Sequence, residues 1–473
     1  MSRIFISAAH KSSGKTTVSI GLCAALKQRD LVVQSFKKGP DYIDPYWLAQ
    51  ASGRNCYNLD FYTMERDEIL SLIHEKSKDA NITLIEGNKG LYDGLDLDGS
   101  NSNAALATLT QTPVILVLNA RGMTRGIAPL ILGYQAFDKD VQIKGVILNQ
   151  LGGSRHENKL RNVIEHYTDV DVVGAIHNDK RFDIDERHLG LVPSHEDPFC
   201  EQKISLLADA VNEQVNLEAV LAIANQAPEL LANDAPSDIH AVNIPDENIT
   251  PNIKLGLIRC SAFGFYYPDD LQALQNAGAD LIEIDPCHDK QLPEIDALFI
   301  GGGFPETHMQ KLEANAKLRN AIKSAIDNGL PAYAECGGLM YLARSIEWEH
   351  VVNGNNHIEK RAMVGCIDAD IVMEKRPQGR GYVQLQETEN SLWPERSDNI
   401  INAHEFHYSR FKNVDKNVNF AFDVKRGTGI DGKSDGYIYK NLLANYTHQR
   451  NTRNNPWAKR FINFARVCKS NNG

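Results

Sequence analysis

Residues 8–17 read AAHKSSGKTT, directly after the apolar run IFIS at residues 4–7. An apolar strand, a Gly-Lys-Thr loop and a helix-like stretch at residues 16–29 form the context of a phosphate-binding loop, where backbone N–H groups and a helix N-terminus face an anion. A solvated turn of serine and lysine is the competing interpretation, but it leaves the strand before and the helix after unexplained. The stretch therefore predicts a nucleotide site on the first strand of a parallel sheet.

Each residue type in this loop has its own expected contact with a nucleotide. Gly14 permits close backbone approach, Lys15 reaches the β- and γ-phosphates, and the Thr16 hydroxyl is a ligand for Mg²⁺. Ala9 stands where the usual pattern begins with glycine, and Lys11 adds an early cation, as in the variant loops of ATPases similar to dethiobiotin synthetase and MinD. The expected nucleotide contacts are Lys11, Gly14, Lys15, Thr16 and Thr17.

Carboxylates are expected beside this loop, at the carboxyl edge of the same sheet. The strand NITLIEG brings Glu86 to that edge, where a carboxylate can hold Mg²⁺ together with Thr16. The loop KKGPDYIDP carries Asp41 and Asp44 between glycine and proline. The loop GNKGLYDGLDLDGSNSNAALA after Glu86 is dense in Asp, Gly and Asn. Such a loop orients a metal ion or an acceptor, or is simply an acidic surface loop.

The whole chain shows two rounds of alternation between strands and helices. Apolar runs such as TPVILVLNA and KGVILNQ alternate with amphipathic stretches up to about residue 195, which predicts parallel strands joined by helices. A long helical stretch and a polar, proline-rich stretch follow, and the alternation restarts at KLGLIRC. We therefore predict an α/β fold with domains at residues 1–195 and 252–473, separated by a helix and linker at residues 196–251.

A second reactive centre is predicted at PAYAECGGLMYLA, residues 331–343. Cys336 lies between an apolar strand and a helix-like run, as in a nucleophile elbow that exposes a side chain at a strand-to-helix turn. The N–H of Gly337 would face a developing oxyanion, and GGGFPE after the preceding strand would supply a second donor from Gly303. Cysteine is also a common packing residue in cores, but the flanking Glu335 and glycines favour a turn.

A thiol nucleophile needs a base, and the sequence offers three histidines late in the chain. His404 and His407 lie in AHEFHYS, and His448 lies in NYTHQ. Sequence spacing does not decide among them, and a single histidine is by default a structural residue. The base is therefore left open between the two motifs.

Composition argues against several classes of protein. The 61 acidic and 50 basic residues give a formal net charge of −11, which argues against a surface that follows nucleic-acid phosphates. The eight cysteines are scattered without a Cys-x-x-Cys pair, so we expect neither a zinc nor an iron–sulfur site. The sequence has no apolar stretch of membrane-spanning length and no evident secretory leader, so we expect a cytoplasmic protein without a membrane partner.

Taken in order, the motifs resemble those of the cobyrinic acid a,c-diamide synthase family over essentially the whole chain. They are KSSGKTT, KKGPDYIDP, EGNKGLYDG, ERHLGLVPSHE, GGGFPE, AECGGLMYL, HEFHYS and NYTH. The resemblance implies an N-terminal parallel-sheet P-loop ATPase domain, similar to dethiobiotin synthetase, fused to a C-terminal class I glutamine amidotransferase domain. It also implies the reaction. Glutamine is hydrolysed at the cysteine, ATP phosphorylates a peripheral tetrapyrrole carboxylate, and ammonia displaces the phosphate to leave an amide.

The resemblance also implies roles for individual residues. Cys336 is the nucleophile and His448 raises its nucleophilicity, whereas His404 and His407 support the site or contact the other domain. It implies no acid partner for the histidine. The residues that map to ATP and Mg²⁺ are Gly14, Lys15, Thr16 and Glu86. The residues that map to the acceptor region are Asp41, Tyr42, Asp44, Lys89 and Asp93.

The chain departs from the family pattern at EGNKGLYDG. Family members typically read EGVMGLYDG there, whereas this chain has Asn88 and Lys89 in place of the apolar pair. The difference resembles relatives that amidate siroheme, and a related branch acts on nickel sirohydrochlorin, so the acceptor stays open among cobyrinate, siroheme and nickel sirohydrochlorin. A homodimer also stays open. A MinD-like regulatory ATPase and a degenerate tetrapyrrole-binding chaperone are the rival classes, and neither uses both predicted sites.

Overall fold

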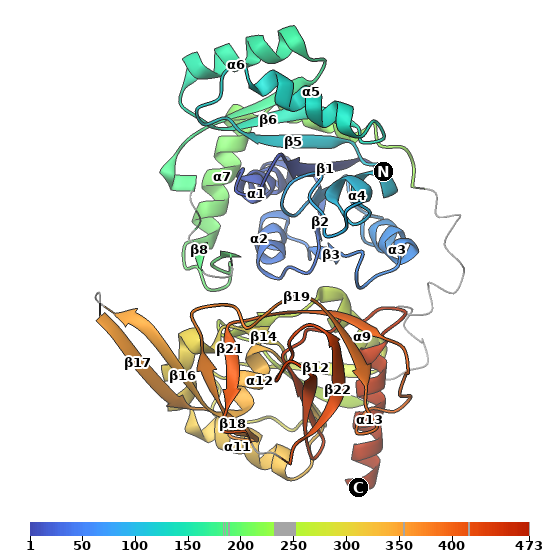
Figure 1. Cartoon of the computed structure of the whole chain (residues 1–473), viewed down its shortest axis with the longest axis vertical. Coiled ribbons are helices and arrows are strands. Elements are labelled where there is room, and N and C mark those ends of the chain that lie inside the picture. Colours follow the sequence, from blue (N-terminus) through green and yellow to red (C-terminus); the bar gives the residue numbers. More distant parts are fainter. Residues whose placement is uncertain are drawn as a thin grey trace. The chain divides into compact units, whose positions relative to one another are not determined.

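The computed structural model describes residues 1–472 except 183, 185, 188–189, 231–251, 353–354 and 415–416 (Figure 1). The chain divides into two compact units, Met1–Pro236 and Ser237–Gly473, each with its own sheet and helices. The predicted α/β class is confirmed in both units. Most of the predicted linker and part of the motif ERHLGLVPSHE lie outside the described residues, and the predicted domain boundaries stay a prediction.

In the described part of the first unit, seven parallel strands form one sheet in the order β3-β2-β4-β1-β5-β6-β7. The strands are β1 (Arg3–Ala8), β2 (Val33–Lys38), β3 (Tyr57–Leu59), β4 (Ile82–Glu86), β5 (Val114–Asn119), β6 (Ile143–Leu151) and β7 (Asp171–His177). β1, β2 and β4 are buried along their whole length, as expected for strands covered by helices on both faces. The loop after β1 therefore opens near the middle of the carboxyl edge.

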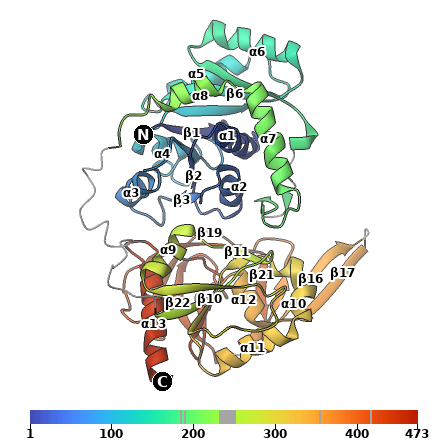
Figure 2. The ribbon, with the colours of Figure 1, turned by 180° about the vertical axis from the view of Figure 1, so that it is seen from behind.

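Helices cover both faces of this sheet (Figures 1 and 2). One core cluster is built on the side chains of α3 (Arg66–Lys76), α4 (Asn103–Leu109), α5 (Ile127–Phe137) and α6 (Ser154–Tyr167). The opposite face carries α1 (Lys15–Lys27), α2 (Ile43–Ser52), α7 (Cys200–Gln214) and α8 (Leu217–Ala224). A 3₁₀ turn, η1 (Lys180–Phe182), and a short hairpin, β8 (Glu186–Arg187) and β9 (Gly190–Leu191), precede α7.

The helical stretch predicted at the start of residues 196–251 is two helices, and both pack on the first unit. Asn216 caps α8 by accepting a hydrogen bond from the N–H of Ala219 at 3.1 Å, and this cap marks the break after α7. Arg3 of β1 donates to the carbonyl oxygen of Pro228 just after α8, at 2.6 Å. The chain up to Pro228 is thus held to the first sheet.

In the described part of the second unit, nine strands form a mixed sheet in the order β12-β10-β13-β15-β24-β23-β22-β19-β20. The first five, parallel, strands are β12 (Ala279–Ile284), β10 (Ile253–Ile258), β13 (Ala297–Ile300), β15 (Ala332–Glu335) and β24 (Leu442–Asn445). The antiparallel extension is β23 (Ser434–Tyr439), β22 (Asn419–Arg426), β19 (Gly379–Glu387) and β20 (Ile401–His407). The parallel half is the part whose carboxyl edge can carry a site.

Smaller elements complete this unit. A second sheet is formed by β17 (Asn355–Ala362), β16 (Ala343–Val352), β18 (Ile367–Met373) and β21 (Ser409–Lys412), and a short ribbon pairs β11 (Phe263–Phe265) with β14 (Gly302–Gly303). The helices are α9 (Pro268–Asn276), the 3₁₀ turn η4 (Pro305–His308), α10 (Met309–Ala314), α11 (Ala316–Asp327), α12 (Gly337–Leu342) and α13 (Trp457–Asn472). Across the ranges that the structure describes, no helix combines the length and apolar character needed to cross a membrane.

Candidate active sites

The first candidate site lies at the carboxyl edge of the adjacent strands β2, β4 and β1. The carboxylate oxygen Oε1 of Glu86, at the end of β4, accepts hydrogen bonds from Lys15 Nζ (3.1 Å) and Thr16 Oγ1 (2.7 Å) at the start of α1. The structure therefore brings together the predicted lysine, threonine and glutamate. Glu86 is completely buried, so solvent water cannot take the place of Lys15 and Thr16 as hydrogen-bond donors to its carboxylate.

Lys37 of β2 is a central member of this cluster, and it was not among the predicted site residues. Its ammonium group is 2.8 Å from Glu86 Oε1, 2.5 Å from Asp44 Oδ2 and 3.8 Å from Asp41 Oδ2, and its side chain is 1 % exposed. Burial opposes the charged form, but the carboxylates of Asp44 and Glu86 outweigh it and hold the pKa of Lys37 well above its usual range. The sequence gives no clear signal for Lys37, because β2 reads VQSFKK and contains several other polar residues.

One oxygen of Glu86 is suited to bind a cation. Burial would raise the pKa of Glu86, but the ammonium groups of Lys37 and Lys15 lower it to about 2, so the carboxylate is charged. Its Oε2 is buried and accepts no hydrogen bond from any described residue. A charged, desolvated oxygen next to a threonine hydroxyl fits a hard divalent cation.

Asp41 and Asp44 lie next to this cluster, as the sequence predicted. Asp44 Oδ2 accepts a hydrogen bond from Thr16 Oγ1 at 3.2 Å, which joins the loop after β2 to the phosphate-binding loop. Asp41 Oδ1 caps the start of α2 by accepting from the backbone N–H groups of Ile43 (2.9 Å) and Asp44 (3.2 Å). Burial and the charge of Asp44 raise the pKa of Asp41 to about 7, against the opposing effect of Lys37. Tyr42, between them, is buried.

The phosphate-binding loop itself is tied down from two sides. Gly14, at the N-cap of α1, has φ 81°, a left-handed backbone angle that favours glycine. The side-chain amide of Asn149, at the end of β6, donates to the carbonyl oxygen of Ser13 at 2.9 Å, and Thr17 Oγ1 donates to the carbonyl oxygen of Gly14 at 2.8 Å. Asn149 was not predicted, because nothing near it in the sequence marks it. Lys11 is exposed at the start of the loop.

The remaining acceptor-region residues, Lys89 and Asp93, lie on the exposed surface of the loop after β4. Asp93 Oδ2 accepts the N–H of Gly90 at 2.8 Å, and the amide of Asn103 donates to the carbonyl oxygen of Gly90 at 2.7 Å. Among the described residues, no hydrogen bond joins Lys89 or Asp93 to the Glu86 cluster.

Lys38, the last residue of β2, is influenced by the charge of Lys89. Burial lowers the pKa of Lys38 to about 8; the positive charge of Lys89 also lowers it, and the carboxylate of Asp60 raises it.

The second candidate site lies at the carboxyl edge of the adjacent strands β13, β15 and β24. Cys336 follows β15 and has φ 47° and ψ −102°, a strained backbone for a residue other than glycine. Its N–H donates to the carbonyl oxygen of Asn445 at the end of β24, at 2.7 Å. Cys336 is buried, with 6 % of its surface exposed. This is the strand-to-helix turn that the sequence predicted, with α12 beginning at the next residue.

Gly303 and Gly337, the two predicted oxyanion donors, come into direct backbone contact. A Cβ added at Gly337 would lie 2.9 Å from the nitrogen and 2.8 Å from the oxygen of Gly303. A Cβ added at Gly303 would lie 2.1 Å from the carbonyl oxygen of Ala262. Side chains do not fit at either position, so the backbone of β14 reaches the turn that carries Cys336.

Of the three candidate histidines, His448 is the one that lies beside both Cys336 and Glu335. Its ring accepts or donates a hydrogen bond with the thiol of Cys336, and Glu335 Oε2 lies 3.5 Å from its Nδ1. Burial would lower the pKa of His448, but the negative charges of Cys336 and Glu335 raise it to about 10. The ring of His404 stacks on His448 with centroids 4.9 Å apart, and His407 stacks on Tyr446 at 3.9 Å.

Glu335 lies beside His448, and the sequence analysis did not place it in the site. Its Oε1 accepts hydrogen bonds from the Tyr333 hydroxyl (2.6 Å) and the backbone N–H of Gln449 (2.9 Å), which fixes the carboxylate beside His448. In the sequence, Glu335 directly precedes Cys336, and there it is evidence only for a turn. Glu335 is the last residue of β15, the strand that leads to Cys336, and its carboxylate lies next to the segment that carries His448.

Buried carboxylates also fix the segment on either side of His448. Asp435 accepts the backbone N–H groups of Tyr446 and Thr447, both at 3.0 Å, before the histidine. Arg450, two residues after it, pairs with Asp269 of α9 at 2.7 Å. The chain is therefore held by buried carboxylates before and after His448, and these contacts set the position of the imidazole.

Known domain families match both units of the chain. Residues 254–456 match the CobB/CobQ-like glutamine amidotransferase domain, and residues 2–184 match an AAA domain, a family of nucleotide-binding P-loop domains. The chain is 41 % identical over 446 residues to a protein of Magnetococcus marinus named cobyrinate a,c-diamide synthase, covering 94 % of this chain and 93 % of that one.

Two archaeal relatives carry the same name. A protein of Methanosarcina acetivorans is 38 % identical over 462 residues, covering 94 % of this chain and 92 % of its own. A protein of Archaeoglobus fulgidus is 38 % identical over 464 residues, covering 98 % of this chain and 97 % of its own. On this near full-length similarity, with both domains matched, the chain belongs to the cobyrinate a,c-diamide synthase family.

Proposed function

We propose that this protein uses ATP and glutamine to convert the a and c acetate carboxylates of a cobyrinate-type tetrapyrrole into amides. The observation that carries the proposal is the presence, in one chain, of a lysine–glutamate cluster on a phosphate-binding loop and a cysteine–histidine pair on a strained turn. A carboxylate resists attack by ammonia until its oxygen becomes a good leaving group. A phosphate site and an ammonia source therefore belong together.

In the second unit, the Cys336 thiolate attacks the side-chain amide carbon of glutamine. The N–H groups of Gly303 and Gly337 stabilise the oxygen anion of the tetrahedral intermediate. The C–N bond then breaks, and the His448 imidazolium donates a proton to the departing nitrogen, which leaves as ammonia. Water hydrolyses the remaining thioester to glutamate and regenerates the thiolate. Glu335 keeps the imidazole ring oriented throughout.

In the first unit, an oxygen of the acceptor carboxylate attacks the γ-phosphorus of ATP, and ADP leaves. When ATP binds, the Lys15 ammonium group leaves Glu86 and pairs with the phosphate oxygens, because a triphosphate carries more negative charge than one carboxylate. Lys37, which is buried among three carboxylates, remains in place and balances their charge. Ammonia then attacks the carbonyl carbon of the acyl phosphate, phosphate leaves and the amide remains. Asp41 and Asp44, next to this cluster, would orient the incoming ammonia.

The residues of the first site suit a Mg²⁺ ion. Thr16 and Glu86 would hold it, since the Oε2 of Glu86 is charged, buried and without a described hydrogen-bond partner. Mg²⁺ would supply neutralisation of the charge that develops on the β- and γ-phosphate oxygens. We further propose that the enzyme acts in the cytoplasm, and we leave a homodimer open.

The proposal is tested by mass spectrometry of the macrocycle after incubation with ATP and glutamine labelled with ¹⁵N in its side-chain amide. Cobyrinic acid, siroheme and nickel sirohydrochlorin are offered separately. We expect the label to appear in cobyrinic acid, and only when ATP is present. Labelling of siroheme or nickel sirohydrochlorin instead would support the same amidation reaction on a different substrate. Asn88 and Lys89, which replace the usual apolar pair of the family, would then be the residues that mark this difference. A protein that labels none of the three while hydrolysing ATP would support a regulatory ATPase.

A further inference from the structure

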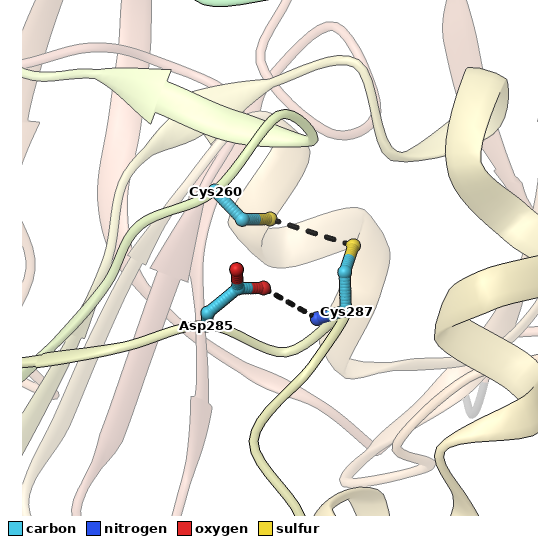
Figure 3. Close-up of side chains that lie close together, drawn as sticks. All are labelled: Cys260, Asp285 and Cys287. Atoms are coloured by element: carbon cyan, nitrogen blue, oxygen red, sulfur yellow. Dashed lines mark hydrogen bonds between the residues drawn. The ribbon is translucent and has the colours of Figure 1, made fainter.

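Two cysteines and an aspartate converge at a place that neither proposed reaction uses. Cys260 follows β10, and Asp285 and Cys287 follow β12, the strand that pairs with β10 in parallel. The three side chains point toward one another (Figure 3). Their sulfur and carboxylate atoms all lie within 4.8 Å of one another, and the two sulfurs are 3.7 Å apart. Among the described residues, no other set of three His, Cys, Asp or Glu side chains has its ligand atoms this close together.

The distance between the sulfurs fits two thiolates on one metal ion. Two Zn–S bonds of about 2.3 Å at a tetrahedral angle place their sulfurs roughly 3.8 Å apart. A disulfide would need about 2.0 Å. Thiolate ligands are soft and select Zn²⁺ over the hard ions Mg²⁺ and Ca²⁺. The observed distance of 3.7 Å between the two sulfurs matches this spacing.

Neighbouring groups hold the ligand atoms in place. The backbone N–H of Ala262 donates to Cys260 Sγ at 3.3 Å, and the backbone N–H of Cys287 donates to Asp285 Oδ1 at 2.8 Å. The Nδ1 atom of His288 is 2.7 Å from Asp285 Oδ2, so the imidazole can fix the carboxylate, as partners behind metal ligands commonly do. Cys260, Asp285 and Cys287 follow strands at the carboxyl edge of the sheet, and Cys260 and Asp285 are partly exposed, so an ion can reach them.

We propose that Cys260, Asp285 and Cys287 form a Zn²⁺ site, with water as the fourth ligand. The site goes beyond the proposed amidation and does not depend on it. It also revises the expectation from the sequence, in which no zinc site was predicted because the two cysteines are 27 residues apart and lie outside any Cys-x-x-Cys pair. The pairing of β10 with β12 supplies the proximity that the sequence spacing hides.

The site is linked to the second reaction centre through one short turn. The backbone N–H and carbonyl groups of Cys260 both bond to those of Phe263, at 2.9 and 3.1 Å. Phe263 is paired with Gly303 in the β11–β14 ribbon. A zinc ion would thus join the loop after β12 to the turn that supports a proposed oxyanion donor. We expect removal of zinc to lower glutaminase activity without abolishing it.

The test measures Zn²⁺ binding to the reduced, full-length chain by competition with a chromophoric chelator. The Cys336→Ala background removes binding to the thiol of the reaction centre. We expect one ion per chain, and an affinity at least about 100-fold lower in Cys260→Ser and Cys287→Ser, since even partners behind metal ligands cost about 10–100-fold. Cys468→Ser is the matched control, because Cys468 is also partly exposed and lies outside the cluster, so it should bind zinc as the parent does.

A second readout separates ligand loss from misfolding. Co²⁺ in place of Zn²⁺ should give sulfur-to-metal charge-transfer absorbance in the parent and in Cys468→Ser, but not in Cys287→Ser. Asp285→Asn, which keeps both thiols and the shape of the side chain, should retain that absorbance with weaker binding. Absence of stoichiometric zinc, unchanged affinity after Cys287→Ser, or a Cys260–Cys287 disulfide without zinc in acid-quenched cells would overturn the proposal.

Discussion

The two units place different chemistry at the same part of an α/β sheet. In the first, the candidate residues lie at the carboxyl ends of β2 and β4 and on the loop after β1. In the second, they lie after β13, β15 and β24. Each set therefore comes from three adjacent parallel strands, where the crevice outside the strand ends is the usual ligand site. The fold provides the location, and the side chains provide the difference.

The first site is a network of charges that a ligand can rearrange. One oxygen of Glu86 accepts Lys15, Thr16 and Lys37 together, and the other has no described partner. The second site is a fixed geometry, with a strained Cys336 and a histidine oriented by buried carboxylates. Phosphoryl transfer is mostly positioning and charge neutralisation, whereas attack by a thiol depends on one trajectory. Substitutions should therefore affect the two sites in different ways.

The largest expected effect is the loss of glutaminase activity in Cys336→Ala. Removing the nucleophile should lower glutamine hydrolysis by at least about 10⁴-fold, since the covalent route disappears. Measured with ammonium salt in place of glutamine, ATP-dependent amidation should continue at a rate close to that of the parent. A parallel loss of the ammonia-dependent reaction would contradict the division of chemistry between the two units.

Lys15→Ala should give the opposite pattern, with a smaller loss. Removing one cation that stabilises the transferred phosphoryl group should lower ATP-dependent amidation by roughly 10²–10³-fold, with either ammonia or glutamine as nitrogen source. Glutaminase activity, measured without ATP and acceptor, should remain at the rate of the parent protein. Lys27→Ala is the matched control, because Lys27 is an exposed lysine at the C-terminal end of α1 and has no described contact with Glu86. Equal losses in the two variants would argue against a specific phosphate contact by Lys15.

Glu335→Gln should sharpen the comparison through its dependence on pH. The pKa of His448 is raised to about 10 from an ordinary value near 6.5, so the imidazolium form is present below that range and is lost as the pH rises through 10. Without the Glu335 charge the pKa should fall, and the alkaline limb of glutaminase kcat/KM should move to lower pH. We also expect a loss of roughly 10- to 100-fold, because proton transfer by a positioned group contributes about 10²–10⁴ and the imidazole itself remains.

A control for this prediction is Glu387→Gln. Glu387 is also a buried carboxylate, but it pairs with Arg460 at 2.8 Å and has no described contact with His448. Its substitution should leave the alkaline limb where it is, whatever its effect on stability. A shift of the limb in Glu387→Gln, or none in Glu335→Gln, would show that the histidine does not depend on a local carboxylate.

Local patterns predicted the residues of each site that lie at the ends of strands or on the loops after them. The Gly-Lys-Thr loop, Glu86 and Cys336 each follow an apolar run, and their spacing sets their place in an α/β sheet. Lys37 was missed because it lies inside a strand, where its burial depends on carboxylates from two other segments. Asn149 was missed for a similar reason, since its contact with Ser13 joins distant parts of the chain.

Long-range pairing explains the other residues that the sequence did not reveal. Glu335 and His448 are far apart in the sequence, and only the pairing of β15 with β24 brings their segments together. The same holds for Cys260 and Cys287, which follow the paired strands β10 and β12. Sequence periodicity gives the elements but not the order of strands in a sheet. Residues whose role depends on a neighbour across the sheet therefore stay hidden.

The smallest expected effect is in Lys89→Ala, on the exposed loop after β4. Lys89 has φ 43° already, so replacing it with alanine adds no new backbone strain. If its ammonium group pairs with an acceptor carboxylate in solvent, its loss should raise the KM for the tetrapyrrole roughly two- to fivefold, the effect of about 0.5–1 kcal/mol for an exposed ion pair. The KM values for ATP and glutamine should stay, because Lys89 has no described contact with either site.

Added salt then distinguishes this exposed lysine from the buried Lys15. Screening should shrink the difference in KM between Lys89→Ala and the parent as ionic strength rises, since exposed charges interact weakly beyond about 10 Å at 0.1 M salt. The loss in Lys15→Ala should persist, because its partner Glu86 is fully buried. Asp98→Asn on the same loop is the control for a general change of surface charge. A change in the KM for ATP in Lys89→Ala would instead place that residue at the nucleotide.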